Sequence, residues 1–420
     1  MPAADTENIV IAGAGLAGAT AARTLRAEGY TGRITLFGAE AHHPYLRPPL
    51  SKEYLLGKAA EDSVPVVPDG WYAENDVELR LGVPVTGVDP GSRTVRIGDG
   101  SSLKYSALLL ATGSFPRHIL LPGSGLEGVT TFRTLDDSRL LRGKLEAGGR
   151  NVVMIGSGWI GMELAAAATI YGNHVTLLGL EDIPLGAAIG PELGGFFRSL
   201  HGANGVQFRL PASAREITGK SGTVTGVVTD SGELLPADLV IIAVGVVPDT
   251  AVAETAGLDL KNGILTDASL RTGAPGIFAA GDVANALHPF TGEHHRSEHW
   301  SNALNGGKVA AKSMLGQDVT LDAIPYFYTD QFDVSMEYSG FPTLAAGAAP
   351  VIRGSLEARE FMAFWQQDGR VVAGMSVNWP RSIKPGAQKT IKALISARAR
   401  ITPETLADAD TPLDQLLPAA

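Results

Sequence analysis

Residues 8–18, NIVIAGAGLAG, decide the fold, because an apolar run leads directly into three closely spaced glycines. An alanine-rich helical stretch follows, and then a second apolar run at residues 33–37 (RITLF). A strand, a glycine turn, a helix and a strand within about 30 residues are typical of a dinucleotide-binding βαβ unit. Gly13 permits the tight turn, Gly15 lets a pyrophosphate approach the backbone, and Gly18 lets the helix pack on the strand. Free amides at the helix start would hold the phosphates.

The same pattern occurs again at residues 150–161, RNVVMIGSGWIG. Its three turn residues are Gly156, Gly158 and Gly161. We expect a helix from Met162 to about Tyr171 and a strand over residues 174–178. A repeated unit could be a duplication with one inactive site. Each unit, however, has a candidate ribose-binding acid about 20 residues on, Glu40 and Glu181, which favours two working dinucleotide sites.

The composition limits the classes of protein that remain. The 420 residues predict two or three domains at about 150 residues each. The net charge of -10 disfavours nucleic acid or an anionic membrane as the main partner. The chain contains no cysteine, which excludes disulfides, thiolate nucleophiles, thiolate metal sites and redox dithiols. No metal centre is expected.

Targeting signals are also missing from the sequence. No apolar run approaches the 18 or more residues that a membrane span requires. Asp5 and Glu7 stand where a secretion signal carries positive charge. We therefore expect a cytoplasmic protein.

Three later segments complete the pattern. Buried-type strands at residues 107–110 and 239–242 each run into a glycine-containing turn that ends at a proline. Residues 276–283, GIFAAGDV, predict a short strand, a glycine that permits close approach, and an acid at a helix start. With these segments the chain resembles the glutathione-reductase-like flavoproteins, in which the first fingerprint holds FAD and the second holds NAD(P)H.

Residues 47–52, RPPLSK, narrow the resemblance, because disulfide reductases of that superfamily carry a CxxxxC motif in this region. RPPLSK, Glu163 and residues 325–331 (PYFYTDQ) are similar to the FAD-dependent ferredoxin reductases of oxygenase systems, the putidaredoxin reductase and biphenyl dioxygenase ferredoxin reductase family. The resemblance runs from Asn8 to about Lys392.

The resemblance implies an α/β fold with two Rossmann-like dinucleotide-binding domains and a smaller α+β C-terminal domain. An FAD-binding domain would comprise residues 1–118 and 246–322, and an NADH-binding domain residues 119–245. The C-terminal domain would comprise residues 323–420, with a helix near residues 389–397. We expect the proline-containing tail after Ile401 to be loosely packed.

The resemblance also assigns catalytic residues. Lys52 would lie beside the flavin and form an ion pair with Glu163, and Arg47 would meet an FAD phosphate. On the residues alone, a solvated lysine near a helix start is the simpler interpretation of Lys52. Glu163 is equally compatible with an acid that only favours its helix dipole. Asp282 could be an N-cap that serves only its helix, but Gly281 before it and the apolar strand behind it favour a contact with the ribityl chain. Arg133 would contact FAD, and Trp300 would lie beside the flavin ring. The remaining expected cofactor-binding residues are Ala17, Val85, Ala111, Thr112, Gly113, Ile160, Gly245 and Gly281.

The ribose contacts depart from the family pattern. Relatives usually place the acid directly after the second strand, where this chain has Ala39 and Gly179. NADPH requires a cation for its 2′-phosphate, and no lysine or arginine occurs between Arg150 and Arg198. The sequence therefore favours NADH over NADPH.

The resemblance implies an NADH:ferredoxin oxidoreductase. Hydride would pass from NADH to FAD, and single electrons would leave to a [2Fe–2S] ferredoxin that serves a cytochrome P450 or a ring-hydroxylating dioxygenase. One alternative is an NADH-sensing flavoprotein like apoptosis-inducing factor. Others are a rubredoxin reductase and an NADH oxidase.

A basic region suggests where the ferredoxin docks. Between Asp368 and Glu404 there is no acid, and the cations there are Arg370, Arg381, Lys384, Lys389, Lys392, Arg398 and Arg400. These could be a solvated helix face. Ferredoxins are typically acidic, however, so we expect electrostatic docking on this part of the C-terminal domain.

Overall fold

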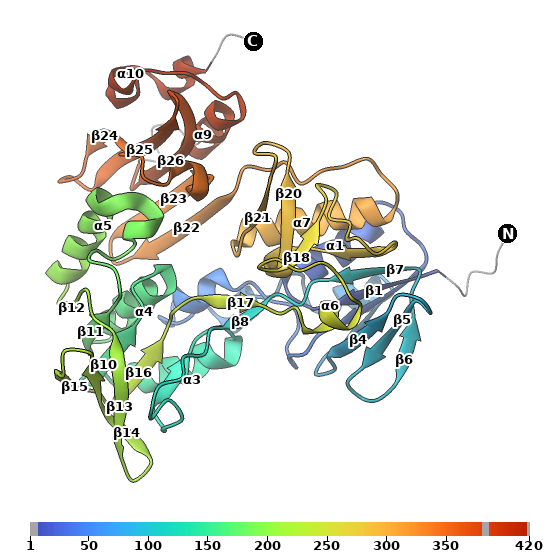
Figure 1. Cartoon of the computed structure of the whole chain (residues 1–420), viewed down its shortest axis with the longest axis horizontal. Coiled ribbons are helices and arrows are strands. Elements are labelled where there is room, and N and C mark those ends of the chain that lie inside the picture. The colour runs from blue at the N-terminus through green and yellow to red at the C-terminus, as the bar shows by residue number, and fades with distance from the viewer. Residues whose placement is uncertain (1–6, 380–385, 418–420) are drawn as a thin grey trace. The chain divides into compact units, whose positions relative to one another are not determined.

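The computed structural model describes residues 7–379 and 386–417 (Figure 1). These residues form two compact units. The first unit comprises residues 7–47, 60–115 and 246–325, and the second comprises residues 48–59, 116–245 and the described residues from 326 onward.

The first unit contains a five-stranded parallel sheet in the order β19-β7-β1-β2-β3. Its strands are β1 (Asn8–Ala12), β2 (Arg33–Phe37), β3 (Val77–Arg80), β7 (Ala107–Leu110) and β19 (Ile277–Ala279). The three central strands are almost continuously apolar and buried, as expected for a parallel sheet covered on both faces.

Helices α1 (Leu16–Ala27) and α7 (Trp300–Met314) pack closely on one another through small residues. A side chain at Gly307 would collide with the carbonyl oxygen of Ala17. The alanine-rich sequence of α1 therefore serves close helix packing as well as helix formation.

Smaller elements surround this sheet. One three-stranded antiparallel sheet consists of β4 (Val85–Asp89), β5 (Thr94–Ile97) and β6 (Ser102–Lys104). A second, mixed sheet consists of β18 (Ile264–Thr266), β20 (Ala284–His288) and β21 (Glu293–Arg296). Strands β8 (Ser114–Pro116) and β17 (Val246–Pro248) pair with each other. The short helices are α2 (Trp71–Glu74), α6 (Ala251–Thr255), and the 3₁₀ turns η2 (Glu61–Ser63) and η3 (Gly281–Val283).

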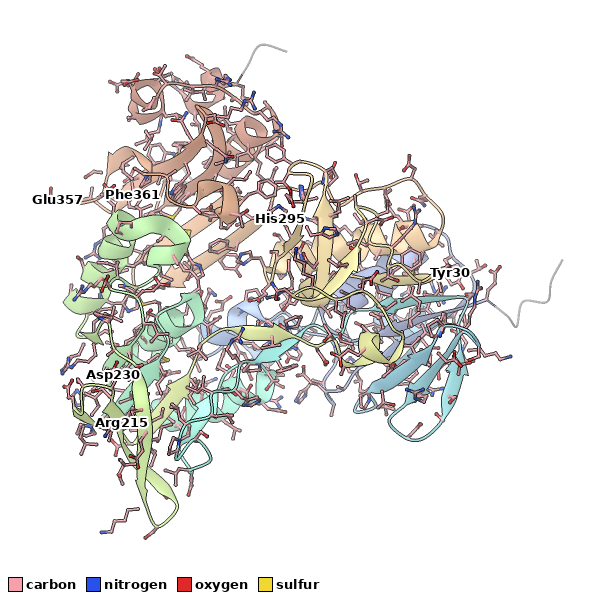
Figure 2. All side chains as sticks on the ribbon, viewed as in Figure 1. Tyr30, Arg215, Asp230, His295, Glu357 and Phe361 are labelled. Atoms are coloured by element: carbon pink, nitrogen blue, oxygen red, sulfur yellow. The ribbon has the colours of Figure 1, made fainter. Side chains whose placement is uncertain are left out.

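The second unit repeats the parallel sheet in the order β12-β11-β10-β16-β9. Its strands are β9 (Val129–Thr131), β10 (Asn151–Ile155), β11 (His174–Leu178), β12 (Gln207–Arg209) and β16 (Leu239–Ile242). Its helices are α3 (Leu135–Leu145), α4 (Trp159–Ile170) and α5 (Gly186–Ala203). An antiparallel sheet of β13 (Ala214–Lys220), β14 (Thr223–Thr229) and β15 (Leu234–Pro236) carries the exposed Arg215 and Asp230 (Figure 2).

A five-stranded antiparallel sheet in the order β22-β23-β26-β25-β24 also belongs to this unit. Its strands are β22 (Tyr326–Gln331), β23 (Val334–Gly340), β24 (Val351–Ser355), β25 (Glu360–Gln367) and β26 (Arg370–Val377). Helix α9 (Ala387–Ser396) packs on β23 and β26. Phe361 of β25 is fully buried (Figure 2) and packs against Phe196 of α5. The remaining elements are α8 (Pro342–Ala345), α10 (Pro403–Ala407) and the 3₁₀ turns η1 (Pro48–Ser51) and η4 (Leu413–Leu416).

The predicted fold class is confirmed, since two parallel sheets of the dinucleotide-binding type accompany an α+β C-terminal part. Three local predictions need correction. Helix α4 begins at Trp159 rather than Met162, because residues of the fingerprint already form its first turn. The turn at Asp282 is a single 3₁₀ turn followed by strand β20, so Asp282 does not cap an α-helix.

The third correction concerns the tail after Ile401, which is anchored by the buried Leu406 and Leu413. Leu406 is fully buried, and the guanidinium of Arg353 donates to the carbonyl oxygens of Leu406, Ala409 and Thr411. Because that guanidinium is itself buried, these carbonyls serve as its hydrogen-bond partners, and the tail is fixed to strand β24.

Candidate functional site

The first fingerprint forms a turn that only glycine fits at its first and third positions. Gly13 has a φ of +118°, and a side chain there would collide with the carbonyl oxygen of Ala111 at the end of β7. A side chain at Gly18 would collide with the carbonyl oxygen of Gly13. Gly15 instead faces open space. Helix α1 begins after Gly15 with no side-chain cap and no acid in its first turn, so its free amides fit a nucleotide pyrophosphate.

The second fingerprint repeats this geometry. Gly156 has a φ of +119° and lies against the carbonyl oxygen of Ala243, and Gly161 lies against the carbonyl oxygen of Gly156. Gly158 faces open space, and α4 also begins without a side-chain cap or an early acid. Both turns therefore fit a nucleotide phosphate, which supports two working sites over a duplication with one inactive site.

The two candidate ribose acids have different surroundings. Glu40 is half-buried, accepts a hydrogen bond from the hydroxyl of Tyr45 at 2.5 Å, and pairs with Arg47 at 2.8 Å. Glu181 is exposed and accepts a hydrogen bond from the backbone amide of Ala187 at 3.0 Å, in the first turn of α5. Each of the two carboxylates thus already has at least one hydrogen-bond partner within the protein, in addition to any ribose hydroxyl that it would bind.

Asp282 lies in η3 and is buried. Its carboxylate accepts a hydrogen bond at 2.8 Å from the hydroxyl of Ser114, which follows the predicted Ala111, Thr112 and Gly113 turn. Gly281 has a φ of +79° and packs against Ala17 of the first fingerprint, so η3 and the start of α1 are neighbours. Ser114 was not predicted as a site residue, because a single serine in a turn gives no signal of its own.

Five other predicted cofactor residues lie in the first unit or in the second. Trp300 is the first residue of α7. Burial lowers the pKa of the preceding His299 to about 4, although the negative charge of Asp282 acts to raise it. Val85 is buried in β4. In the second unit, the backbone amide of Arg133 donates to Asp137 in the capping box of α3. Ile160 is partly exposed in the first turn of α4, and Gly245 has a φ of +92° after β16.

Lys52 and Glu163 form the buried ion pair that the resemblance implies. The Nζ atom of Lys52 is 2.8 Å from Oε2 of Glu163, and the two side chains are only 6% and 4% exposed. Lys52 follows η1, and Glu163 lies in the second turn of α4. The ring of Tyr328 lies 5.4 Å from Nζ. Burial and nearby acids raise the pKa of Tyr328 to about 12, so its hydroxyl stays neutral beside the pair.

Two hydroxyl groups that the sequence did not identify complete this cluster. Ser51 donates to Oε2 of Glu163 at 2.5 Å, and Thr329 on β22 donates to Oε1 at 2.6 Å. Both residues are buried. The carboxylate of Glu163 therefore has three side-chain donors from two separate parts of the chain, residues 51–52 and strand β22.

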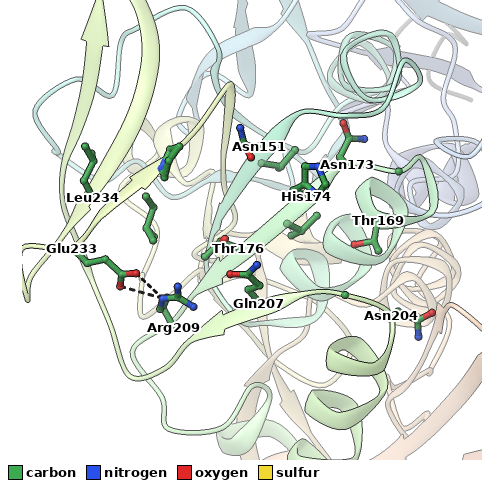
Figure 3. Close-up of a pocket in the computed structure, with 16 residues that line it drawn as sticks. Asn151, Thr169, Asn173, His174, Thr176, Asn204, Gln207, Arg209, Glu233 and Leu234 are labelled. Atoms are coloured by element: carbon green, nitrogen blue, oxygen red, sulfur yellow. Dashed lines mark hydrogen bonds and ion pairs between the residues drawn. The ribbon is translucent and has the colours of Figure 1, made fainter.

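A separate polar pocket of about 500 Å³ lies in the second unit (Figure 3). Asn151 and His174, which begin β10 and β11, line it, and the ion pair of Arg209 with Glu233 lies on its wall. Dinucleotides bind at the carboxyl ends of such strands, so this pocket is not the nucleotide site.

Neither a metal site nor a membrane span is found in the part of the chain that the structure describes. Residues 7–379 and 386–417 contain no group of histidine and acidic side chains able to hold a metal ion. Within the same residues, no helix has the length and apolar character needed to cross a bilayer.

A glycine turn that fits a phosphate follows the central strand of each parallel sheet, and the second unit holds a buried lysine–glutamate pair. These features are typical of an oxidoreductase that binds two dinucleotides. The model of the pyridine nucleotide-disulphide oxidoreductase family matches residues 7–307, and the reductase C-terminal model matches residues 326–417. The chain belongs to the pyridine nucleotide-disulphide oxidoreductase family, as one of its NAD(P)H-dependent ferredoxin reductases, which confirms the resemblance.

The comparisons span nearly the full chain. The anthranilate 1,2-dioxygenase system ferredoxin–NAD(+) reductase component of Burkholderia cepacia is 38% identical over 400 residues, 95% of this chain and 96% of that protein. The rubredoxin–NAD(+) reductase of Ectopseudomonas oleovorans is 34% identical over 373 residues, 89% and 96% of the two chains. The crystal structure of the covalent putidaredoxin reductase–putidaredoxin complex is similar with a TM-score of 0.92, 33% identity and 98% coverage of both chains.

Proposed function

We propose that this protein is an NADH:ferredoxin oxidoreductase that delivers single electrons to a [2Fe–2S] ferredoxin of a cytochrome P450 or ring-hydroxylating dioxygenase system. The observation that carries the proposal is the buried Lys52–Glu163 pair in a chain that has two nucleotide turns and no cysteine. Without thiols, electrons cannot leave through a disulfide, so a one-electron carrier is the natural acceptor. A cytoplasmic location is part of this proposal.

The residues divide the binding tasks between them. The chemistry supplied by bound FAD and NADH is hydride transfer followed by release of electrons one at a time. The amides of α1 hold the FAD pyrophosphate, the Arg47 guanidinium offers a further phosphate contact, and Asp282 accepts from the ribityl chain. The amides of α4 hold the NADH phosphates. Lys52 presents a fixed positive charge at the reacting rings, and Glu163 offsets the cost of burying it.

The remaining predicted residues shape the same two cofactor sites. Glu40 and Glu181 would contact the ribose hydroxyls through their remaining carboxylate lone pairs. We assign the other contacts by position to Ala17, Val85, Ala111, Thr112, Gly113, Arg133, Ile160, Gly245, Gly281 and Trp300. We keep the division at residues 118, 245 and 322 as the proposed domain organisation, with an FAD-binding, an NADH-binding and a C-terminal domain.

NADH is proposed over NADPH because the stretch from β10 to α5 lacks lysine and arginine through residue 197. Arg209 lies opposite Leu178, at the end of neighbouring strand β12, but is paired with Glu233 at 3.0 Å. An arginine held by a carboxylate is a poor partner for a 2′-phosphate.

The proposed ferredoxin dock is the basic part of the C-terminal domain. Arg370, Lys389, Arg398 and Arg400 are exposed, and Lys392 lies 4.3 Å from the ring of Tyr326. Arg381 and Lys384 lie outside the described residues. The solved complex of a relative with putidaredoxin supports a ferredoxin as the kind of partner.

A rubredoxin is the second candidate acceptor, because a relative that aligns with 89% of this chain is named a rubredoxin–NAD(+) reductase. The test is a cytochrome c reduction assay with purified protein, using NADH or NADPH and either a [2Fe–2S] ferredoxin or a rubredoxin. We expect one FAD released per chain on denaturation, a higher kcat/KM with NADH, and faster turnover with ferredoxin. Absence of FAD would overturn the flavoprotein assignment, and faster turnover with rubredoxin would replace the acceptor.

A further inference from the structure

The carboxylate of Glu163 receives more support than an ion pair alone provides. Lys52 and Ser51 approach its Oε2 atom, and Thr329 approaches Oε1 at 2.6 Å. Lys52 has only one short contact, since its distances to the Pro48 carbonyl oxygen and the Ser51 hydroxyl are 3.3 and 3.4 Å. The geometry of the pair therefore depends on how firmly Glu163 is held.

The hydroxyl of Thr329 has a defined direction. An ionised carboxylate can only accept hydrogen bonds, so Thr329 must donate its single hydroxyl hydrogen to Glu163. Its oxygen can then only accept from the next group, Gln331, whose Nε2 is 3.1 Å away. This fixes the orientation of the Gln331 amide, with its nitrogen toward Thr329 and its oxygen toward the opposite side.

The amide oxygen of Gln331 lies 2.8 Å from Nε2 of His201 on α5. Because an amide oxygen only accepts, His201 must donate from Nε2. Burial lowers the pKa of His201 to about 4, so its ring is neutral near pH 7 and carries its one proton on Nε2. The Nδ1 atom is buried and has no hydrogen-bond partner among the described residues. The donors therefore run one way, from His201 through Gln331 and Thr329 to Glu163.

Strand β22 is built to present this chain. Phe327, Thr329 and Gln331 alternate along the strand, so they share one face. Phe327 packs against Trp159 of α4, with 5.2 Å between ring centres, and Thr329 donates a hydrogen bond to Glu163, four residues after Trp159 on the same helix. Thr329 and Gln331 are 0% and 1% exposed. A buried polar pair in a strand position that would suit apolar residues needs hydrogen-bond partners, and Glu163 and His201 provide them.

We propose that Thr329 is a positioning residue for the Lys52–Glu163 pair, oriented by Gln331 and His201, so that the C-terminal domain helps to hold the charge that faces the reacting cofactors. The role rests on the proposed function, since it assumes that the pair acts in NADH oxidation. Thr329 itself need not touch a cofactor. It fixes the Glu163 carboxylate, and Glu163 fixes the ammonium group of Lys52.

The test replaces Thr329 with valine, which keeps the shape of the side chain and removes the hydroxyl, and with serine, which restores it. Thr229→Val is the matched control, because Thr229 is 1% exposed on a strand of the same unit and its hydroxyl bonds Ser231 and Glu233 instead. One readout is the ¹³C resonance of the Glu163 carboxyl in protein labelled at glutamate Cδ, identified by its loss in Glu163→Gln. The other is stopped-flow reduction of the bound flavin by NADH.

We expect Thr329→Val to move the Glu163 carboxyl resonance and to lower the limiting rate of flavin reduction roughly tenfold, the equivalent of one charge-assisted hydrogen bond. The Kd for NADH should stay unchanged, Thr329→Ser should recover most of the rate, and Thr229→Val should alter neither readout. Gln331→Met should give a smaller change in the same direction.

An unmoved Glu163 resonance in Thr329→Val, or an equal loss in Thr329→Ser, would overturn the positioning role. Neither readout involves a ferredoxin, so these results are independent of the acceptor. If wild-type protein bound no FAD, the proposed function would fail first, and the carboxyl resonance would still report whether Thr329 holds Glu163.

Discussion

The stability of the Lys52–Glu163 pair can be measured by a double-mutant cycle of Lys52→Met, Glu163→Gln and the two together. The charged atoms are 2.8 Å apart and the side chains are more than nine-tenths buried. At an effective dielectric constant of about 20, their attraction is about 6 kcal/mol before desolvation is subtracted. Removing one partner of such a pair costs about 3–5 kcal/mol, because the other charge stays buried.

The structure predicts an asymmetry between the two single variants. Lys52→Met leaves Glu163 with hydroxyl donors at 2.5 and 2.6 Å, whereas Glu163→Gln leaves Lys52 with oxygen contacts no shorter than 3.3 Å. We therefore expect Glu163→Gln to lose about 5 kcal/mol and Lys52→Met about 3 kcal/mol. The double variant, which buries no charge, should be at least about 2 kcal/mol more stable than Glu163→Gln alone.

The assay is urea unfolding at pH 7 with saturating FAD, followed by tryptophan fluorescence and compared through the midpoints at a common slope. Glu233→Gln is the control, because it breaks the more exposed Arg209–Glu233 pair of the same unit and should cost less than about 1 kcal/mol. If the double variant lost the sum of the single losses, the two charges would not be coupled. If Lys52→Met were the more damaging change, the account of the extra donors would be wrong.

Three further outcomes follow from single groups. Burial lowers the pKa of His201 from 6.5 to about 4, and its ring neighbours Phe208 and Phe332 carry no charge. Between these pH values the unfolded chain binds a proton that the folded chain does not, so the free energy of unfolding falls as the pH drops. In urea titrations from pH 6.5 to pH 4, the wild type should lose about 3 kcal/mol more than His201→Gln. Gly156→Ala should abolish NADH binding in equilibrium titrations while FAD content stays at the wild-type level, since the new methyl group collides with the Ala243 carbonyl; retained NADH affinity would contradict this. Lys389→Glu should slow ferredoxin reduction several-fold at low salt but not NADH–ferricyanide turnover, with Lys220→Glu as the exposed control, and equal losses in both activities would point to folding instead.

The local elements of the fold could be predicted well from the sequence because their causes are local. The glycine spacings determine the two turns, and the apolar runs determine the parallel strands of both sheets. The boundary errors arose where this local logic is weakest. Helix α4 starts inside the fingerprint, and the turn at Asp282 leads to a strand because β20 finds partners in β18 and β21.

The candidate site could be predicted only in part. Lys52 and Glu163 stand in recognisable motifs, and the expected ion pair is present. Thr329 lies in the PYFYTDQ segment that supports the resemblance, but nothing local indicates that its partner is Glu163, 166 residues away in sequence. His201 lies in no motif, and its partner Gln331 is 130 residues away. Their role depends on which strand face meets which helix, and neither periodicity nor propensity encodes that information. The packed tail was missed for the same reason, because Arg353 reaches it from a distant strand.

The two nucleotide units show how one backbone motif acquires different uses. Thr20 and Glu163 are each the fifth residue of the helix that follows the glycine turn, and both are buried. In the first unit α1 is covered by α7, and Thr20 packs against Gly307, where small side chains allow the two helices to approach. In the second unit α4 is covered by strand β22 and by η1, which together supply a lysine and two hydroxyl groups. Burying a carboxylate at this position would be strongly unfavourable without those donors. Glu163, η1 and the C-terminal sheet therefore depend on one another for function.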